Sequence, residues 1–170
     1  VHERIAHLVR TLDEGIALKR RIIENLRPSA LQNLGLKAAL EILTREFASG
    51  AAIEIEAQID EVTLGPEANL SLYRLVQEAL TNVSKYAAAT RVVVQVAHEA
   101  DGVRVKVEDN GKGFDTRLLR PETHGLTGMR FRIESHGGQL DVRSAPGQGT
   151  TISAWLPIEE SQQAPLKVAA

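Results

Sequence analysis

Three polar side chains stand at spacings of four and three residues in the segment 70–87: Glu78, Asn82 and Lys85. On a helix these spacings place the side chains along one edge. A carboxamide oxygen is a hard ligand suited to Mg²⁺, an ammonium neutralises phosphate, and a carboxylate orients a water or a nucleophile. The row therefore indicates a site for a metal ion and phosphate. For this helix taken alone, a solvated face carrying Glu and Lys is the simpler interpretation.

A second group of residues follows directly after an alternating apolar and basic run at 103–108, which is typical of a half-buried strand. It comprises Asp109, Gly111 and Gly113. Glycine lets the backbone approach a ligand closely, so an acidic residue followed by two spaced glycines at the end of a strand suits a nucleotide pocket. An ordinary turn rich in Asp, Asn and Gly is the alternative.

The elements that must position these residues follow from periodicity and from Gly and Pro breaks. The apolar residues Leu72, Leu75, Val76, Ala79 and Val83 share one helical face, which can pack on a sheet and leave the polar row at its edge. The order is helix, helix, strand, helix, strand, strand, helix, strand, strand, which predicts an α+β fold with helices layered on one sheet. Helices are predicted at 1–27, from about 36 to 49, at 66–87 and at 125–136, and strands at 52–57, 91–98, 103–108, 139–144 and 150–156.

Composition excludes several classes of function. The net charge of −2 offers no electrostatic footprint for nucleic acid, and the absence of cysteine removes disulfides, thiol catalysis and thiolate metal sites. No apolar run approaches the roughly 20 residues that span a bilayer. The sequence also lacks a P-loop, and the glycines after Asp109 lack the third glycine of a dinucleotide fingerprint. Because the chain begins within a helical pattern, we expect a fragment of a longer protein.

Four stretches resemble the motifs of Bergerat-fold ATPases, the family of histidine kinases, gyrase-type topoisomerases, mismatch-repair ATPases and related chaperones. They occur in the family's order and on the expected element types. They are Glu78-x-x-x-Asn82-x-x-Lys85 for the N box, Asp109-x-Gly111-x-Gly113 for the G1 box, Gly125-Leu126-Thr127-Gly128-Met129-Arg130 for the G2 box, and Gly149-Thr150-Thr151 for the terminal Gly-Thr element.

The form of the G2 box is similar to that of one group of sensor histidine kinases, the nitrate-sensor and desaturase-sensor type. Leu26-Arg27-Pro28, followed by Leu34-Gly35-Leu36, resembles the end of the second dimerisation helix and its junction to the ATPase domain. The resemblance implies a Bergerat-type two-layer sandwich, a mixed sheet covered on one face by helices, after a long N-terminal helix. It divides the chain into the dimerisation helix and linker (1–34), the ATP-binding catalytic domain (35–158) and a flexible tail (159–170).

The resemblance also implies ATP and Mg²⁺ as ligands. Asp109 would accept a hydrogen bond from the adenine amine, and Thr150 would support the ring. Asn82 would ligate Mg²⁺ held by the phosphates and would form the catalytic set with Glu78 and Lys85. The other residues assigned to ATP binding are Tyr86, Gly111, Gly113, His124, Gly125, Leu126, Gly128 and Met129, together with Lys85.

Two departures from the family pattern concern histidine. Tyr86 stands where the family usually places His after the N-box Lys. The acceptor histidine belongs on a first dimerisation helix, but His2 lies on the same predicted helix as Leu26-Arg27-Pro28, which leaves no room for a helical hairpin. We therefore expect the acceptor helix to be absent from this chain, and we expect no self-phosphorylation. His136, at the end of a predicted helix, is assigned a structural role.

These features predict the ATP-binding catalytic portion of a cytoplasmic two-component sensor histidine kinase, which transfers the γ-phosphoryl of ATP to a histidine. The expected partners are ATP or ADP, the acceptor helix of the full-length kinase, a response-regulator receiver domain, and a second copy in the full-length homodimer. No nucleic-acid or membrane contact is expected of this segment. Two alternatives are a non-enzymatic, degenerate Bergerat-fold interaction module and an anti-sigma-type serine kinase.

Overall fold

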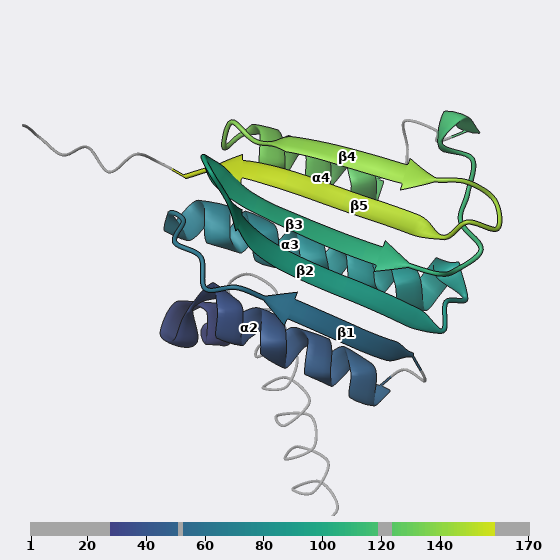
Figure 1. The fold of residues 1–170 in the computed structure, drawn as a ribbon, viewed down its shortest axis with the longest axis horizontal. Helices are drawn as coiled ribbons and strands as arrows, with labels where there is room; N and C mark the ends of the chain where they lie inside the picture. The colour runs from purple at the N-terminus through teal and green to yellow at the C-terminus, as the bar shows by residue number, and fades with distance from the viewer. Residues whose placement is uncertain (1–27, 51–52, 119–123, 159–170) are drawn as a thin grey trace, which may run out of the picture.

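The computed structural model describes residues 28–50, 53–118 and 124–158, which form one sheet with helices packed against it (Figure 1). The predicted helix at 1–27 and the predicted tail at 159–170 lie outside the described residues. In chain order the elements are α2 (Ser29–Gly50), β1 (Glu54–Ile59), α3 (Pro66–Asn82), the π-helical turn η1 (Val83–Ala87), β2 (Arg91–Glu99), β3 (Gly102–Asp109), the 3₁₀ turn η2 (Thr116–Leu118), α4 (His124–Glu134), β4 (Gln139–Ser144) and β5 (Thr150–Pro157).

The sheet has five strands in the order β1-β2-β3-β5-β4. β1 pairs with β2 in parallel, and every other neighbouring pair is antiparallel. The helices α2, α3 and α4 cover one face of this mixed sheet (Figure 1). The predicted α+β two-layer sandwich is therefore confirmed.

The core lies between the sheet and the helices. Alternating valines of β2 and β3 point toward the helices, and all five residues of the predicted apolar face of α3 are buried. Burying a valine or leucine side chain stabilises the fold by about 1.5–3 kcal/mol. The residues concerned are Val92, Val94 and Val96 of β2, Val103, Val105 and Val107 of β3, and Leu72, Leu75, Val76, Ala79 and Val83 of the third helix and its extension.

Helix boundaries differ from the sequence prediction in three places. α2 begins at Ser29 rather than near Leu36, but the chain is kinked at Gly35, where φ is 84°. The helix predicted to run to residue 87 is α-helical only to Asn82 and continues as the π turn, which ends before Ala88 in the left-handed region. α4 ends at Glu134 because residues 135–137 form a turn. Side-chain periodicity locates helices well, but the last turn depends on local backbone hydrogen bonds.

A polar contact links the N-terminal part of α3 to the residues that follow the C-terminus of α4. Nε2 of His136, just after α4, lies 3.0 Å from Oγ of Ser71. On the same helix, Met129 and Ile133 are fully buried against the sheet. His136 is thus part of the packing between the two helices, in agreement with its predicted structural role.

At the end of β3 opposite to Asp109, the indole of Trp155 packs over a glycine. A Cβ on Gly102, the first residue of β3, would overlap Nε1 of Trp155. The indole therefore covers Gly102, and the absence of a side chain at this position makes room for the ring. In the part of the chain that the structure describes, no helix is both long enough and apolar enough to span a membrane.

Candidate nucleotide-binding site

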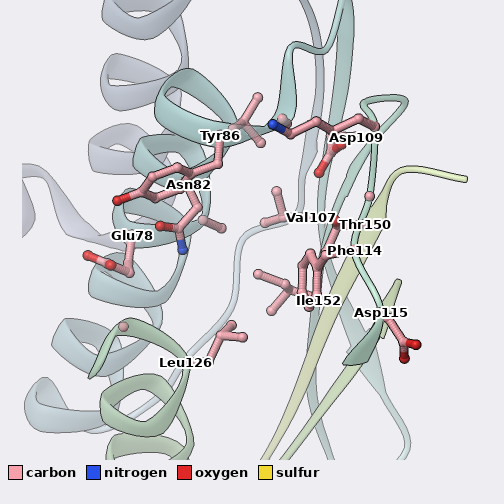
Figure 2. Close-up of a pocket in the computed structure, with 16 residues that line it drawn as sticks. Glu78, Asn82, Tyr86, Val107, Asp109, Phe114, Asp115, Leu126, Thr150 and Ile152 are labelled. Carbon is pink, nitrogen blue, oxygen red and sulfur yellow. The ribbon is translucent and has the colours of Figure 1, made fainter. Parts of the chain in front are cut away.

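A cavity of about 730 Å³ lies between the end of α3, the sheet and the start of α4 (Figure 2). Its volume is in the range of small-molecule sites. The residues that line it are Glu78, Ala79, Asn82, Val83, Tyr86, Ala87, Val107, Asp109, Lys112, Gly113, Phe114, Asp115, Gly125, Leu126, Thr150 and Ile152.

Asp109 is the buried acidic residue of this cavity, with 7% of its surface exposed. It ends β3, opposite Thr150 in the ladder with β5, and its Oδ1 accepts a hydrogen bond of 2.8 Å from the backbone N–H of Gly111. Burial raises the pKa of Asp109 above its ordinary value, and hydrogen bonds from Gly111 and Thr150 oppose that rise. The carboxylate is therefore a desolvated acceptor, fixed in direction by its neighbours.

The loop after Asp109 is fastened to the end of the third helix. The backbone N–H of Lys112 donates to the carbonyl of Ala87 at 2.8 Å. The side chain of Asn110 accepts hydrogen bonds of 2.9 Å from the backbone N–H groups of Thr90 and Arg91. These contacts hold the G1-box stretch against the segment that follows the N box, although the strands β2 and β3 separate the two in the chain.

Gly113 shows why this loop requires glycine. Its φ is 58°, in the left-handed region, and a Cβ there would overlap the carbonyl oxygen of Ala145. Any side chain would collide with backbone of the turn between β4 and β5. The spacing of the G1-box glycines therefore reflects a close contact between two backbones.

The N-box residues occupy the wall formed by the third helix. Glu78, Asn82 and Tyr86 follow one another along this wall, facing Asp109 and Thr150 across the cavity (Figure 2). Lys85 is exposed and does not line the cavity. The π turn begins at Val83, so residues beyond Asn82 no longer follow the α-helical spacing from which the row of three was predicted.

The predicted G2-box residues divide into two groups. Gly125 and Leu126 line the cavity. Gly128 and Met129 do not, because Met129 is fully buried in the core and a Cβ on Gly128 would face the guanidinium of Arg132 at 3.3 Å. His124 begins α4, and its side chain lies outside what the structure describes.

The motifs do not predict the apolar residues that the strands contribute to the cavity, although strand alternation could have located them. Val107 lies two residues before Asp109, and Ile152 two residues after Thr150, so each pair shares one face of its strand. Phe114 comes from the loop and lies beside Ile152 and Thr150 in Figure 2. Together they provide a flat apolar surface next to a buried acceptor, which suits a heteroaromatic ring.

The donor groups on the third helix fit a magnesium ion held partly by a ligand. Asn82 offers a carboxamide and Glu78 a carboxylate, both hard oxygen donors. Among the described residues no group of three or more His, Cys, Asp or Glu side chains is placed to hold a metal. A metal here would therefore take its remaining ligands from phosphate oxygens and water, as Mg²⁺ does in nucleotide sites.

Comparison with known proteins agrees with this site. Residues 67–160 match the model of the histidine kinase-, DNA gyrase B- and HSP90-like ATPases, so the chain belongs to that family. Among curated proteins it is 37% identical over 139 residues to sensor histidine kinase LiaS of Bacillus subtilis, covering 82% of this chain and 39% of LiaS. It is also 37% identical over 158 residues to the histidine-protein kinase/phosphatase DegS of Brevibacillus brevis, covering 92% of this chain and 41% of DegS. The chain thus spans about two-fifths of the length of these relatives.

Solved structures give the same result. The histidine kinase domain of the blue-light activated kinase EL346 of Erythrobacter litoralis superposes with a TM-score of 0.62 at 28% identity, covering 72% of this chain and 61% of that chain. The predicted identification as a histidine kinase catalytic domain is confirmed, and the relatives favour neither alternative. The nitrate-sensor and desaturase-sensor subfamily, the domain limits and the individual site residues remain predictions.

Proposed function

We propose that this chain binds ATP and Mg²⁺ and serves as the catalytic portion of a two-component sensor histidine kinase, which donates the γ-phosphoryl group to a histidine on a dimerisation helix outside the described residues. The observation that carries the proposal is the cavity in which buried Asp109 faces Glu78 and Asn82. A nucleotide spans both ends of such a cavity, with its base at the carboxylate and its phosphates at the helix.

At the base end, Asp109 accepts a hydrogen bond from the exocyclic amine of adenine. Guanine carries a carbonyl oxygen at the corresponding position, so an ionised carboxylate repels it and selects adenine. Val107 and Ile152 support this assignment, because they offer apolar contact to the faces of the ring beside Asp109. Tyr86 at the rim of the cavity adds a second aromatic surface.

At the phosphate end, Asn82 and Glu78 would hold Mg²⁺ together with the phosphates, and the ion would supply neutralisation of the charge on the transferring phosphoryl group. Asn82 and Glu78 orient this end of the nucleotide, and backbone N–H groups in the first turn of α4, near Gly125, favour an anion. Lys85 is exposed in the π turn that follows Asn82. The chain's own contribution is therefore positioning and charge compensation.

In the transfer itself, an imidazole nitrogen of the acceptor forms a bond to the γ-phosphorus. The bond from that phosphorus to the oxygen bridging the β- and γ-phosphates breaks, and ADP leaves with the electron pair. The relatives are named sensor or signal-transduction histidine kinases, which supports a response-regulator receiver domain as the next phosphoryl acceptor. A homodimer of the full-length kinase and a cytoplasmic location of this portion belong to the same proposal.

The test is phosphotransfer to a separately supplied polypeptide that carries the acceptor helix, measured with γ-labelled ATP. We expect acid-labile, base-stable label on the acceptor, dependence on Mg²⁺, and no label on the chain alone. Asn82→Ala should remove the Mg²⁺ dependence of nucleotide binding, measured by calorimetry. ATP binding without transfer would favour a degenerate module, and transfer to serine would favour the anti-sigma type. Absence of any ATP or ADP binding in excess Mg²⁺ would refute the proposal.

A further inference from the structure

Ser144 joins three separate parts of the nucleotide site, although it does not line the cavity. It is the last residue of β4 and is half-buried. Its Oγ accepts a 2.9 Å hydrogen bond from the backbone N–H of Phe114, lies 2.8 Å from the carbonyl of Gly149, and lies 3.0 Å from Oγ1 of Thr150. One hydroxyl thus connects the loop after the G1 box, the turn between β4 and β5, and the first residue of β5.

The loop and the turn also meet at a second point. The backbone N–H of Gly147 donates to the carbonyl of Lys112 at 2.6 Å. The turn between β4 and β5 is therefore docked on the G1-box loop from both sides of Gly113. Of these two links, only the one at Ser144 depends on a side chain, so a substitution can remove it without changing the backbone.

The hydroxyl of Thr150 lies between Ser144 and Asp109, the carboxylate proposed to recognise the base. Thr150 pairs with Asp109 in the ladder between β3 and β5, and its backbone and its hydroxyl both act to lower the pKa of Asp109 against the rise caused by burial. When Thr150 gives its single hydroxyl proton to the ionised carboxylate, its oxygen is left as an acceptor facing Ser144. The proton of Ser144 then bonds either to Thr150 or to the carbonyl of Gly149, and donation to Thr150 completes a chain from Ser144 to Asp109.

We propose that Ser144 is a positioning residue for adenine recognition, which orients the hydroxyl of Thr150 toward Asp109 and anchors the backbone of Phe114 at the wall of the same pocket. This inference rests on the proposed function, because it assigns the base end of the cavity to adenine. Ser144 contacts no part of the nucleotide in this arrangement, and its effect passes through Thr150 and Phe114. Loss of the hydroxyl leaves Thr150 free to rotate and the N–H of Phe114 without its partner.

The test measures the Kd of ADP with Mg²⁺ by calorimetry for the full 170-residue chain and its variants. Ser144→Ala should raise the Kd about three- to tenfold, the effect expected from losing one or two neutral hydrogen bonds. Ser144→Thr keeps the hydroxyl and should retain most of the affinity. Ser153→Ala is the matched control, because this serine lies on β5 between the inward-facing Ile152 and Ala154 and so faces away from the pocket; it should bind as the unmodified chain does.

A double-mutant cycle separates positioning from general destabilisation. Thr150→Val removes one of the two groups through which Ser144 is proposed to act, so Ser144→Ala should raise the Kd by a smaller factor in that variant than in the unmodified chain, and the remaining loss is the part that passes through Phe114. An equal loss of affinity in both backgrounds, or an unchanged Kd in Ser144→Ala, would overturn the inference while leaving the proposed function intact. If the unmodified chain itself does not bind ADP, both this inference and the proposed function are refuted. Melting temperatures of all variants identify any loss of affinity that follows from unfolding.

Discussion

Glu78 on α3 and Gly125 at the start of α4 are in close contact at one wall of the cavity: a Cβ on Gly125 would lie 2.6 Å from Oε1 of Glu78. Residues of two motifs, Glu78 and Gly125, therefore share one wall although they are more than forty positions apart in the chain. The first turn of α4 sets how far the Glu78 side chain can extend toward it. The absence of a side chain at Gly125 therefore leaves the space that the carboxylate of Glu78 occupies.

Substituting Gly125 by alanine should displace the carboxylate of Glu78. Because the atom that must move is the end of a flexible side chain, we expect a small change in stability and a larger one in chemistry. Phosphotransfer to a supplied acceptor helix should fall roughly 10- to 100-fold, the range expected when a reacting group is misplaced by about 1 Å. If the mechanism is correct, Gly125→Ala/Glu78→Ala should be no slower than Glu78→Ala alone; additive losses would contradict it.

Substituting Asp109 by asparagine should weaken ADP binding by about 10- to 100-fold. This range corresponds to the loss of a hydrogen bond to a charged group, about 1.5–3 kcal/mol. Asparagine also presents an N–H₂ group where the adenine amine donates, so two donors oppose each other. Calorimetry with ADP in excess Mg²⁺ measures the effect. An unchanged Kd would exclude Asp109 as the adenine acceptor.

The same substitution should alter stability in a pH-dependent way. Burial raises the folded-state pKa of Asp109 above its ordinary value of 3.8. A carboxyl group shifted in this direction contributes stability below about pH 4, near its unfolded pKa, and loses that contribution as the pH rises through the folded pKa. We therefore expect Asp109→Asn to have its most favourable effect on melting temperature at about pH 7. The difference from the unmodified chain should shrink toward about pH 4, and a difference independent of pH would contradict the shift.

Gly113 and Gly147 provide a matched pair for separating backbone strain from steric collision. Both have positive φ, 58° and 76°, but only Gly113 lacks room, since nothing lies within 4 Å of a Cβ on Gly147. Gly147→Ala should cost about 1–2 kcal/mol, which is the strain of the left-handed conformation. Gly113→Ala should cost distinctly more, because the backbone at Ala145 must also move. Chemical denaturation measures both, and equal losses would show that the collision is relieved without cost.

Much of the fold could be predicted because burial imposes a period on the sequence. The valines of β2 and β3 alternate, and the five apolar residues of α3 and its extension repeat at helical spacing; each set is buried as expected. Asp109 and Gly111 could be placed for the same reason, since a strand that ends at a recognisable point fixes where the next loop begins. Local patterns also placed Glu78 and Asn82 on the correct wall of the cavity.

Other features depend on contacts that a local pattern does not contain. Lys85 is predicted in one row with Glu78 and Asn82 but does not line the cavity, because hydrogen bonding changes from α- to π-helical after Asn82. Ser144 has no distinguishing spacing, and its importance arises from the folding of one turn against the G1-box loop. Met129 lies within a nucleotide-binding motif, yet its side chain belongs to the core.

The packing of Trp155 over Gly102 has a consequence for spectroscopy. This is the single tryptophan of the chain, and it covers the end of β3 that lies seven residues from Asp109, about 20 Å at the rise of an extended strand. Its fluorescence should therefore report the integrity of the sheet and remain insensitive to nucleotide. Emission from Trp155 can accordingly follow unfolding in the presence of saturating ADP, so that ligand-induced stabilisation is read without a direct effect of the ligand on the signal.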